Sequence, residues 1–112
     1  MTSASLSSHV LDLQSGKPAG GLAVSVQALA PSGQLASAVT DADGRIKQWN
    51  TALELSPGVY EVVFDTGSWF AAREQTTLYP QVRICFTVVA GQPHYHIPLL
   101  LSPFGYSTYR GS

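Results

Sequence analysis

Charged residues are scarce in this sequence. Only 12% of its 112 residues are Asp, Glu, Lys or Arg, and the formal net charge is -1. No run of Lys or Arg could follow a phosphate backbone, so we expect no nucleic-acid partner. A surface with so little charge also favours a chain whose exterior is partly covered by copies of itself.

Cysteine and long apolar runs are scarce too. The single cysteine, Cys85, has no partner for an internal disulfide, which is compatible with a reducing compartment. No apolar stretch approaches the roughly 20 residues that a membrane-spanning helix needs. The first eight residues, MTSASLSS, lack the basic start and the apolar stretch of a secretory signal. We therefore expect a soluble, cytoplasmic protein with no membrane partner.

Apolar residues are plentiful and are arranged for strands. They make up 45% of the chain, enough for one core in a single domain of residues 1–112. Alternation with a period of two predicts strands over 22–28, 60–64 and 83–88. Turn-forming sequences rich in Gly, Pro, Asp and Ser separate these segments. The spacing of the turns predicts an all-β antiparallel sandwich of about seven or eight strands.

Residues 66–77 are typical of a helix instead. The stretch AAREQ at 71–75 has fair helix propensity, and Thr66 or Ser68 could cap the N-terminus. The sequence thus predicts one short surface helix.

The three histidines, His9, His94 and His96, are the side chains best suited to exchange protons near neutral pH. In the segment PHYHIPL at 93–99, strand alternation places His94 and His96 on one face and apolar side chains on the other. The two imidazoles would then form a polar site on the exterior of a sheet. A zinc site needs further ligands, which lie far away in the sequence, so we predict no metal. For any single histidine, a structural hydrogen-bonding role is the commoner alternative.

Two further segments carry polar groups. Arg45 follows a tight Asp-Gly turn, and its guanidinium suits a planar substrate with carbonyl oxygens, although an arginine there is commonly a solvated residue at a strand start. The last residues, Tyr109-Arg110-Gly111-Ser112, form either a frayed tail or a segment that folds back into a site.

Five blocks of residues together resemble the 5-hydroxyisourate hydrolases of the transthyretin-like family. They are HVLD at 9–12, GKPA at 16–19, Thr40 with DGR at 43–45, HYHIPLLLSP at 94–103, and YRGS at 109–112. The last two blocks are the specific ones, because a terminal YRGS after such a histidine strand distinguishes these enzymes from transthyretin, a hormone carrier with the same fold. The sequence departs from the family at Leu78-Tyr79-Pro80, where two phenylalanines before the proline are expected.

The resemblance implies a transthyretin-like (prealbumin-like) sandwich of two four-stranded sheets, with one short helix after the fifth strand. It implies a homotetramer, a dimer of dimers with active sites between the dimers, and neither cofactor nor metal. The implied activity is the hydrolysis of 5-hydroxyisourate to 2-oxo-4-hydroxy-4-carboxy-5-ureidoimidazoline in urate catabolism. Carried over position by position, the catalytic residues would be His9, Arg45, His96 and Ser112. The residues that bind substrate would be His9, Arg45, His94, Tyr109, Arg110 and Gly111.

Hydrolysis of a cyclic amide without a cofactor needs an activated water, a held carbonyl group and a stabilised oxyanion. Our hypothesis is that His96, with His9 as its partner, deprotonates the water, and that Arg45 binds the carbonyl oxygens. Ser112 would orient the water or a histidine through its hydroxyl or its carboxylate. Two alternatives stay open: a non-enzymatic transthyretin-type carrier of a small aromatic ligand, whose channel would be mainly apolar, and a structural sandwich module.

Overall fold

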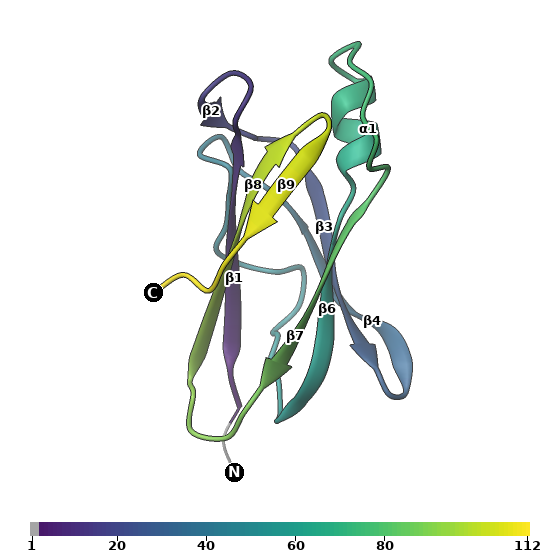
Figure 1. Ribbon diagram of the computed structural model, residues 1–112. Coiled ribbons are helices and arrows are strands. Elements are labelled where there is room, and N and C mark those ends of the chain that lie inside the picture. Colours follow the sequence, from purple (N-terminus) through teal and green to yellow (C-terminus); the bar gives the residue numbers. More distant parts are fainter. Residues whose placement is uncertain (1–2) are drawn as a thin grey trace.

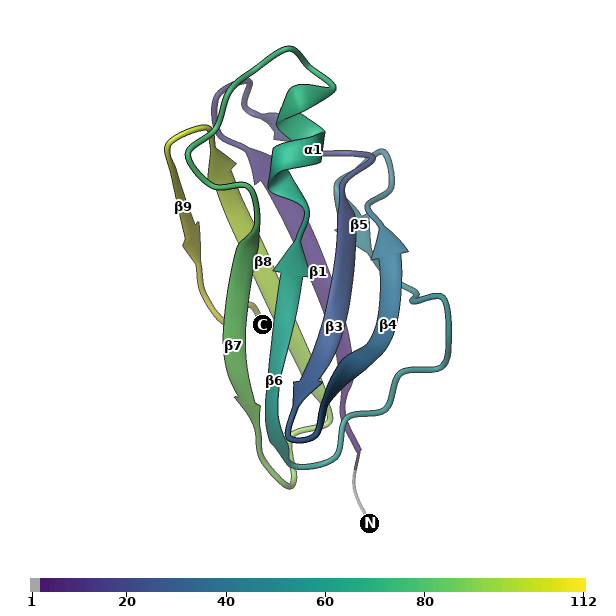
Figure 2. The same ribbon diagram turned by 90° about the vertical axis from the view of Figure 1, so that its right-hand side faces the viewer.

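The computed structural model describes residues 3–112 and consists of two β-sheets that face each other, with one short helix at one end (Figures 1 and 2). The first sheet contains β1 (Ser5–Asp12), β2 (Lys17–Pro18), β5 (Arg45–Ile46), β8 (His94–Ser102) and β9 (Gly105–Thr108). The second sheet contains β3 (Ala23–Leu29), β4 (Ser32–Val39), β6 (Gly58–Phe64) and β7 (Val82–Val88), in the order β4-β3-β6-β7. This arrangement confirms the predicted transthyretin-like sandwich.

Short strands explain where the count differs from the prediction. The first sheet has five strands and not four, because the two-residue strands β2 and β5 both pair with β1. The helix consequently follows the sixth strand. Within residues 3–112, no helix is long and apolar enough to cross a membrane.

β1 and β8 come from opposite ends of the chain and pair in parallel, whereas the other strand pairs are antiparallel. Ser5 lies opposite His94, Ser7 opposite His96, and the whole of β1 follows this register. Parallel neighbours require a long connection between the two strands, and here that connection includes the whole second sheet. The pairing brings the strand that carries His9 beside the strand that carries the other two histidines.

The two sheets share one hydrophobic core. As the alternation predicts, Val24 and Val26 of β3 and Val62 and Phe64 of β6 are buried. The apolar face of β8 enters the same core through Tyr95, Ile97 and Leu99. Because successive strand residues point to opposite faces, this burial fixes His94 and His96 on the outer face of the first sheet.

The helix α1 (Thr66–Ala71) has six residues, so the helix predicted over 66–77 was too long. The chain leaves the helical conformation within the next turn, where Glu74 has a positive φ of 56°. The predicted caps were also wrong. Asp65 occupies the N-cap without a side-chain hydrogen bond, and the buried Thr66 hydroxyl donates instead to the carbonyl oxygen of Tyr79 at 2.7 Å.

Candidate active site

The outer face of β1 and β8 carries most of the candidate residues. Along β1, Ser5, Ser7 and His9 alternate with buried residues, and along β8 the exposed His94 and the half-buried His96 do the same. The structure therefore confirms that His94 and His96 share one polar, outward face.

A tight turn positions Arg45 at the edge of this face. The Asp41 carboxylate accepts hydrogen bonds from the backbone N–H groups of Asp43 at 2.9 Å and Arg45 at 3.0 Å. The bond from Arg45 is the main reason that the pKa of Asp41 lies below its usual value. Gly44 in this turn has a φ of 73°, and a Cβ atom there would collide with the backbone of β1. The turn thus sets β5 against β1 and places Arg45 opposite His9.

The end of the chain folds back onto β8. The Gly111 N–H donates to the carbonyl oxygen of His96 at 2.8 Å, and the two residues form an isolated β-bridge. Gly111 lies so close to the His96 ring that a Cβ atom would collide with it. The Arg110 guanidinium lies 4.8 Å from the centre of the Tyr95 ring and donates to Gln92 Oε1 at 3.1 Å. In Figure 1 the C-terminus lies on the outer side of the first sheet.

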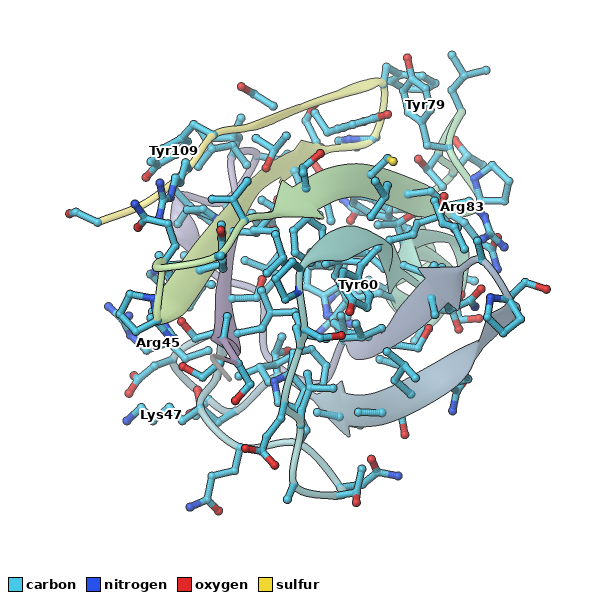
Figure 3. The ribbon with its side chains drawn as sticks, turned by 90° about the horizontal axis from the view of Figure 1, so that it is seen from below. Arg45, Lys47, Tyr60, Tyr79, Arg83 and Tyr109 are labelled. Carbon is cyan, nitrogen blue, oxygen red and sulfur yellow. The ribbon has the colours of Figure 1, made fainter. Side chains whose placement is uncertain are left out.

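A pocket of about 260 Å³ opens where these segments meet. It is lined by Ser7, Ser8, Arg45, Ile46, Lys47, His94, His96 and Ser112. Four of the predicted site residues, Arg45, His94, His96 and Ser112, are therefore brought together. Figure 3 shows Arg45 and Lys47 beside each other on the same side of the molecule.

The other predicted residues lie around this pocket or away from it. His9 follows Ser7 on the same face of β1, and its charge acts on His96. Arg110 and Gly111 border a neighbouring hollow together with His94 and Ser112. Tyr109 is not among the lining residues of the pocket, and it lines a separate, mainly apolar groove along β7, β8 and β9.

His96 has the electrostatic environment of a base. Its partial burial lowers its pKa below the ordinary value for a histidine, and the nearby Arg45, His9 and His94 side chains lower it further. Burial and like charge both disfavour the protonated imidazole. His96 is consequently neutral at neutral pH, which is the form that can accept a proton.

Two serines hold the histidine rings. Ser7 Oγ lies 2.7 Å from His96 Nδ1 and 2.9 Å from His94 Nε2, and Ser5 Oγ lies 2.5 Å from His94 Nδ1. Within the described part of the chain, no group of three or more His, Cys, Asp or Glu side chains could hold a metal ion. The polar groups that line the pocket are imidazoles, hydroxyls, the Arg45 guanidinium and the Lys47 ammonium group.

Comparison with known proteins places this arrangement in a family. Residues 6–111 match the family described as HIUase/Transthyretin. The chain belongs to that family. A relative from Salmonella typhimurium named 5-hydroxyisourate hydrolase is 45% identical over 109 residues, which cover 96% of this chain and 80% of the relative.

Solved structures that are similar to this chain include a 5-hydroxyisourate hydrolase and transthyretins. The structure of Klebsiella pneumoniae 5-hydroxyisourate hydrolase matches with a TM-score of 0.85 and 38% identity, over 100% of this chain and 94% of that one. Transthyretin from Sparus aurata matches with a TM-score of 0.86 and 36% identity, over 95% of each chain. Overall shape therefore does not separate an enzyme from a carrier, and the side chains of the pocket must do so.

Sequence reasoning missed several residues of the candidate site, among them the polar residues Ser5, Ser7 and Lys47. The signal that could have found them is the strand alternation itself. Lys47 lies two residues after Arg45, and Ser7 and Ser5 lie two and four residues before His9, so each shares a face with a predicted residue. Only the register between β1 and β8, which is not local in sequence, shows that the serines reach the histidines.

Proposed function

We propose that this chain hydrolyses 5-hydroxyisourate, opening the ring to give 2-oxo-4-hydroxy-4-carboxy-5-ureidoimidazoline. The observation that carries the proposal is the meeting of Arg45, His96 and Ser112 in one polar pocket, where burial and neighbouring charges lower the pKa of His96. Relatives named 5-hydroxyisourate hydrolase, such as the one from Mus musculus at 42% identity, support it.

In the proposed mechanism, neutral His96 takes a proton from a water molecule while the water oxygen bonds to a carbonyl carbon of the substrate ring. The Arg45 guanidinium stabilises the negative charge that develops on the carbonyl oxygen. The C–N bond of the ring then breaks, and the proton passes from His96 to the departing nitrogen. The carboxylic acid that forms releases its proton to solvent and becomes a carboxylate. His9 supports His96, and Ser112 orients the water or a histidine. No step requires a cofactor.

Around this centre, His94, Arg110 and Gly111 are positioned to bind the substrate from the adjoining hollow. For Tyr109 we propose a different role, because it lines the apolar groove beyond the pocket. There it would contact another copy of the chain.

We further infer that the chain is one domain and assembles as a homotetramer. β7 and β9 are edge strands of their sheets, and the groove between them is lined by apolar side chains such as Ile84, Phe86 and Ile97. Open edges with apolar surroundings are normally covered by a partner. The cytoplasm stays the proposed compartment, and the free thiol of Cys85 is compatible with it.

The carrier alternative fits the pocket less well. Binding sites for small aromatic ligands are lined mainly by apolar and aromatic side chains. Among the described residues that line this pocket, only Ile46 has an apolar side chain, and the others are serines, histidines, Arg45 and Lys47. Such a lining favours chemistry on a polar substrate.

Replacement of His96 by Asn tests the proposal. The variant keeps a polar side chain of moderate size on the outer face of β8, so the fold should be preserved. Loss of a general base typically lowers turnover by a factor of about 10² to 10⁴, and we expect kcat to fall by at least about a hundredfold. Kinetics of substrate decay, with circular dichroism as the control for folding, would measure this. An unchanged kcat in a folded variant would remove His96 from the mechanism.

A further inference from the structure

Ser5, His94, Ser7 and His96 form one hydrogen-bonded chain along the outer face of β1 and β8. Ser5 Oγ contacts His94 Nδ1 at 2.5 Å, His94 Nε2 contacts Ser7 Oγ at 2.9 Å, and Ser7 Oγ contacts His96 Nδ1 at 2.7 Å. The parallel register produces the repetition, because it sets Ser5 beside His94 and Ser7 beside His96.

One set of donors and acceptors along this chain leaves His96 Nε2 free to act as a base, and it starts at Ser5. In this set the Ser5 hydroxyl donates to the carbonyl oxygen of Pro93 at 3.4 Å and accepts a hydrogen bond from His94 Nδ1–H. A neutral imidazole carries a single N–H, so His94 Nε2 is an acceptor and the Ser7 hydroxyl donates to it. A serine has one hydroxyl proton. Ser7 therefore accepts from His96 Nδ1–H.

We propose that Ser7 is a positioning residue that holds His96 in the Nδ1–H tautomer, so that Nε2 is the atom that takes the proton from water. This inference rests on the proposed hydrolysis and deepens it, because it names the reacting atom of the base and the group that prepares it. Within residues 3–112 no hydrogen bond occupies His96 Nε2, whereas Nδ1 is held by Ser7.

The opposite tautomer would be unproductive, because its lone pair would point at Ser7. The proposed tautomer also needs no rearrangement during the reaction. When Nε2 gains a proton, Nδ1–H continues to donate to Ser7, so the hydrogen bond persists in both states of the base. Gly111, packed against the ring, limits its rotation from the other side. Groups arranged in this way before the reaction begins are what make a site effective.

Nitrogen-15 NMR of the histidine rings tests the tautomer directly and without substrate. In the wild-type protein, at a pH where His96 is neutral, we expect a protonated-type signal for Nδ1 and an unprotonated-type signal for Nε2. In Ser7→Ala both nitrogens should move towards intermediate shifts, because both tautomers become populated. Ser7→Thr keeps a hydroxyl on a strand and should restore the wild-type pattern. Ser25→Ala, a serine replacement on the opposite sheet, is the matched control and should change nothing.

Kinetics on the same variants test the consequence for the base. Loss of one hydrogen bond that selects a tautomer shifts that equilibrium by about tenfold. Because both tautomers are then populated, we expect Ser7→Ala to lower kcat by about two- to fivefold, in proportion to the Nδ1–H form that is lost, with little change in KM. Ser7→Thr should recover most of the lost kcat.

The two measurements separate failure of this inference from failure of the proposed function. A wild-type spectrum with an unprotonated Nδ1 at His96, or identical His96 spectra in wild type and Ser7→Ala, would overturn the positioning role whatever the activity. The other case is a protein that gives the expected spectrum but does not accelerate hydrolysis. That result would overturn the role of Nε2 as a base, and the proposed function with it.

Discussion

Two histidines on the same strand face differ here because of their surroundings. His94 is exposed, whereas His96 is half-buried beneath the folded-back chain end and close to Arg45 and His9. Burial and nearby positive charge lower the pKa of His96, which keeps this ring ready to accept a proton. The sequence predicts which face both rings occupy, but the difference between them depends on contacts made by distant segments.

Removal of the positive charge of Arg45 should raise the pKa of His96. The guanidinium disfavours the imidazolium form, so Arg45→Gln should move the pKa back towards its ordinary value and increase the protonated fraction at neutral pH. An NMR titration of the His96 ring would measure the shift independently of activity. Arg83→Gln is the matched control. It removes the same charge from β7, where Arg83 pairs with Glu61 at 2.8 Å. A His96 titration that is the same in both variants would contradict the account.

At the scale of elements, the turn before β5 determines where Arg45 lies. Gly44 combines a φ of 73° with an approach to β1 that leaves no room for a Cβ atom, and Asp41 holds the backbone of Arg45. An arginine after such a turn is uninformative in the sequence alone. It becomes a site residue because the turn fits β5 against the strand that carries His9.

Gly44→Ala should therefore damage both stability and activity. A side chain at positive φ costs about 1 kcal/mol, and the collision with β1 should add about 1–3 kcal/mol, as overpacking usually does. Gly16→Ala is the matched control, because Gly16 has a similar φ of 75° but nothing within 4 Å of an added Cβ atom. Urea unfolding would give both free energies, and we expect only Gly44→Ala to lose kcat as well. Equal effects of the two substitutions would refute the close fit.

Local patterns predict these elements well where one face of a strand is buried. The alternation in 22–28, 60–64 and 93–99 gives the correct inward faces, and the outward pair of His94 and His96 follows from it. The pattern fails where distant contacts decide. The helix ends at Ala71, and the chain turns at the following residues. The parallel pairing of β1 with β8 joins segments more than 80 residues apart, which no local pattern can predict. The chain Ser5–His94–Ser7–His96 depends wholly on that pairing.

At the scale of the whole molecule, exposed apolar surface is concentrated away from the pocket. Phe104 is 70% exposed and Leu78 is 64% exposed, and the groove between β7 and β9 adds further apolar side chains. The low charge of the sequence predicted that part of the exterior is covered, but a single chain does not contain the partner. Local sequence patterns consequently do not predict which surfaces of the copies contact each other.

The assembly can be measured in solution. We expect light scattering at micromolar protein concentration to give a molar mass four times that of one chain, because apolar edges of this kind are normally buried between copies. Ile84→Arg, which places a charge in the groove, should lower the mass, whereas Arg83→Gln on the same strand should leave it unchanged. A wild-type protein with the mass of one chain would contradict the proposed tetramer.

The central claim is that the polar pocket catalyses hydrolysis. Its most direct test is the ultraviolet absorbance decay of freshly generated 5-hydroxyisourate with the protein present at a concentration far below that of the substrate. We predict that all of the substrate disappears faster than it does spontaneously, since each pocket would turn over many molecules. Decay at the spontaneous rate would contradict the claim, because a carrier at such a concentration could bind only a small part of the substrate.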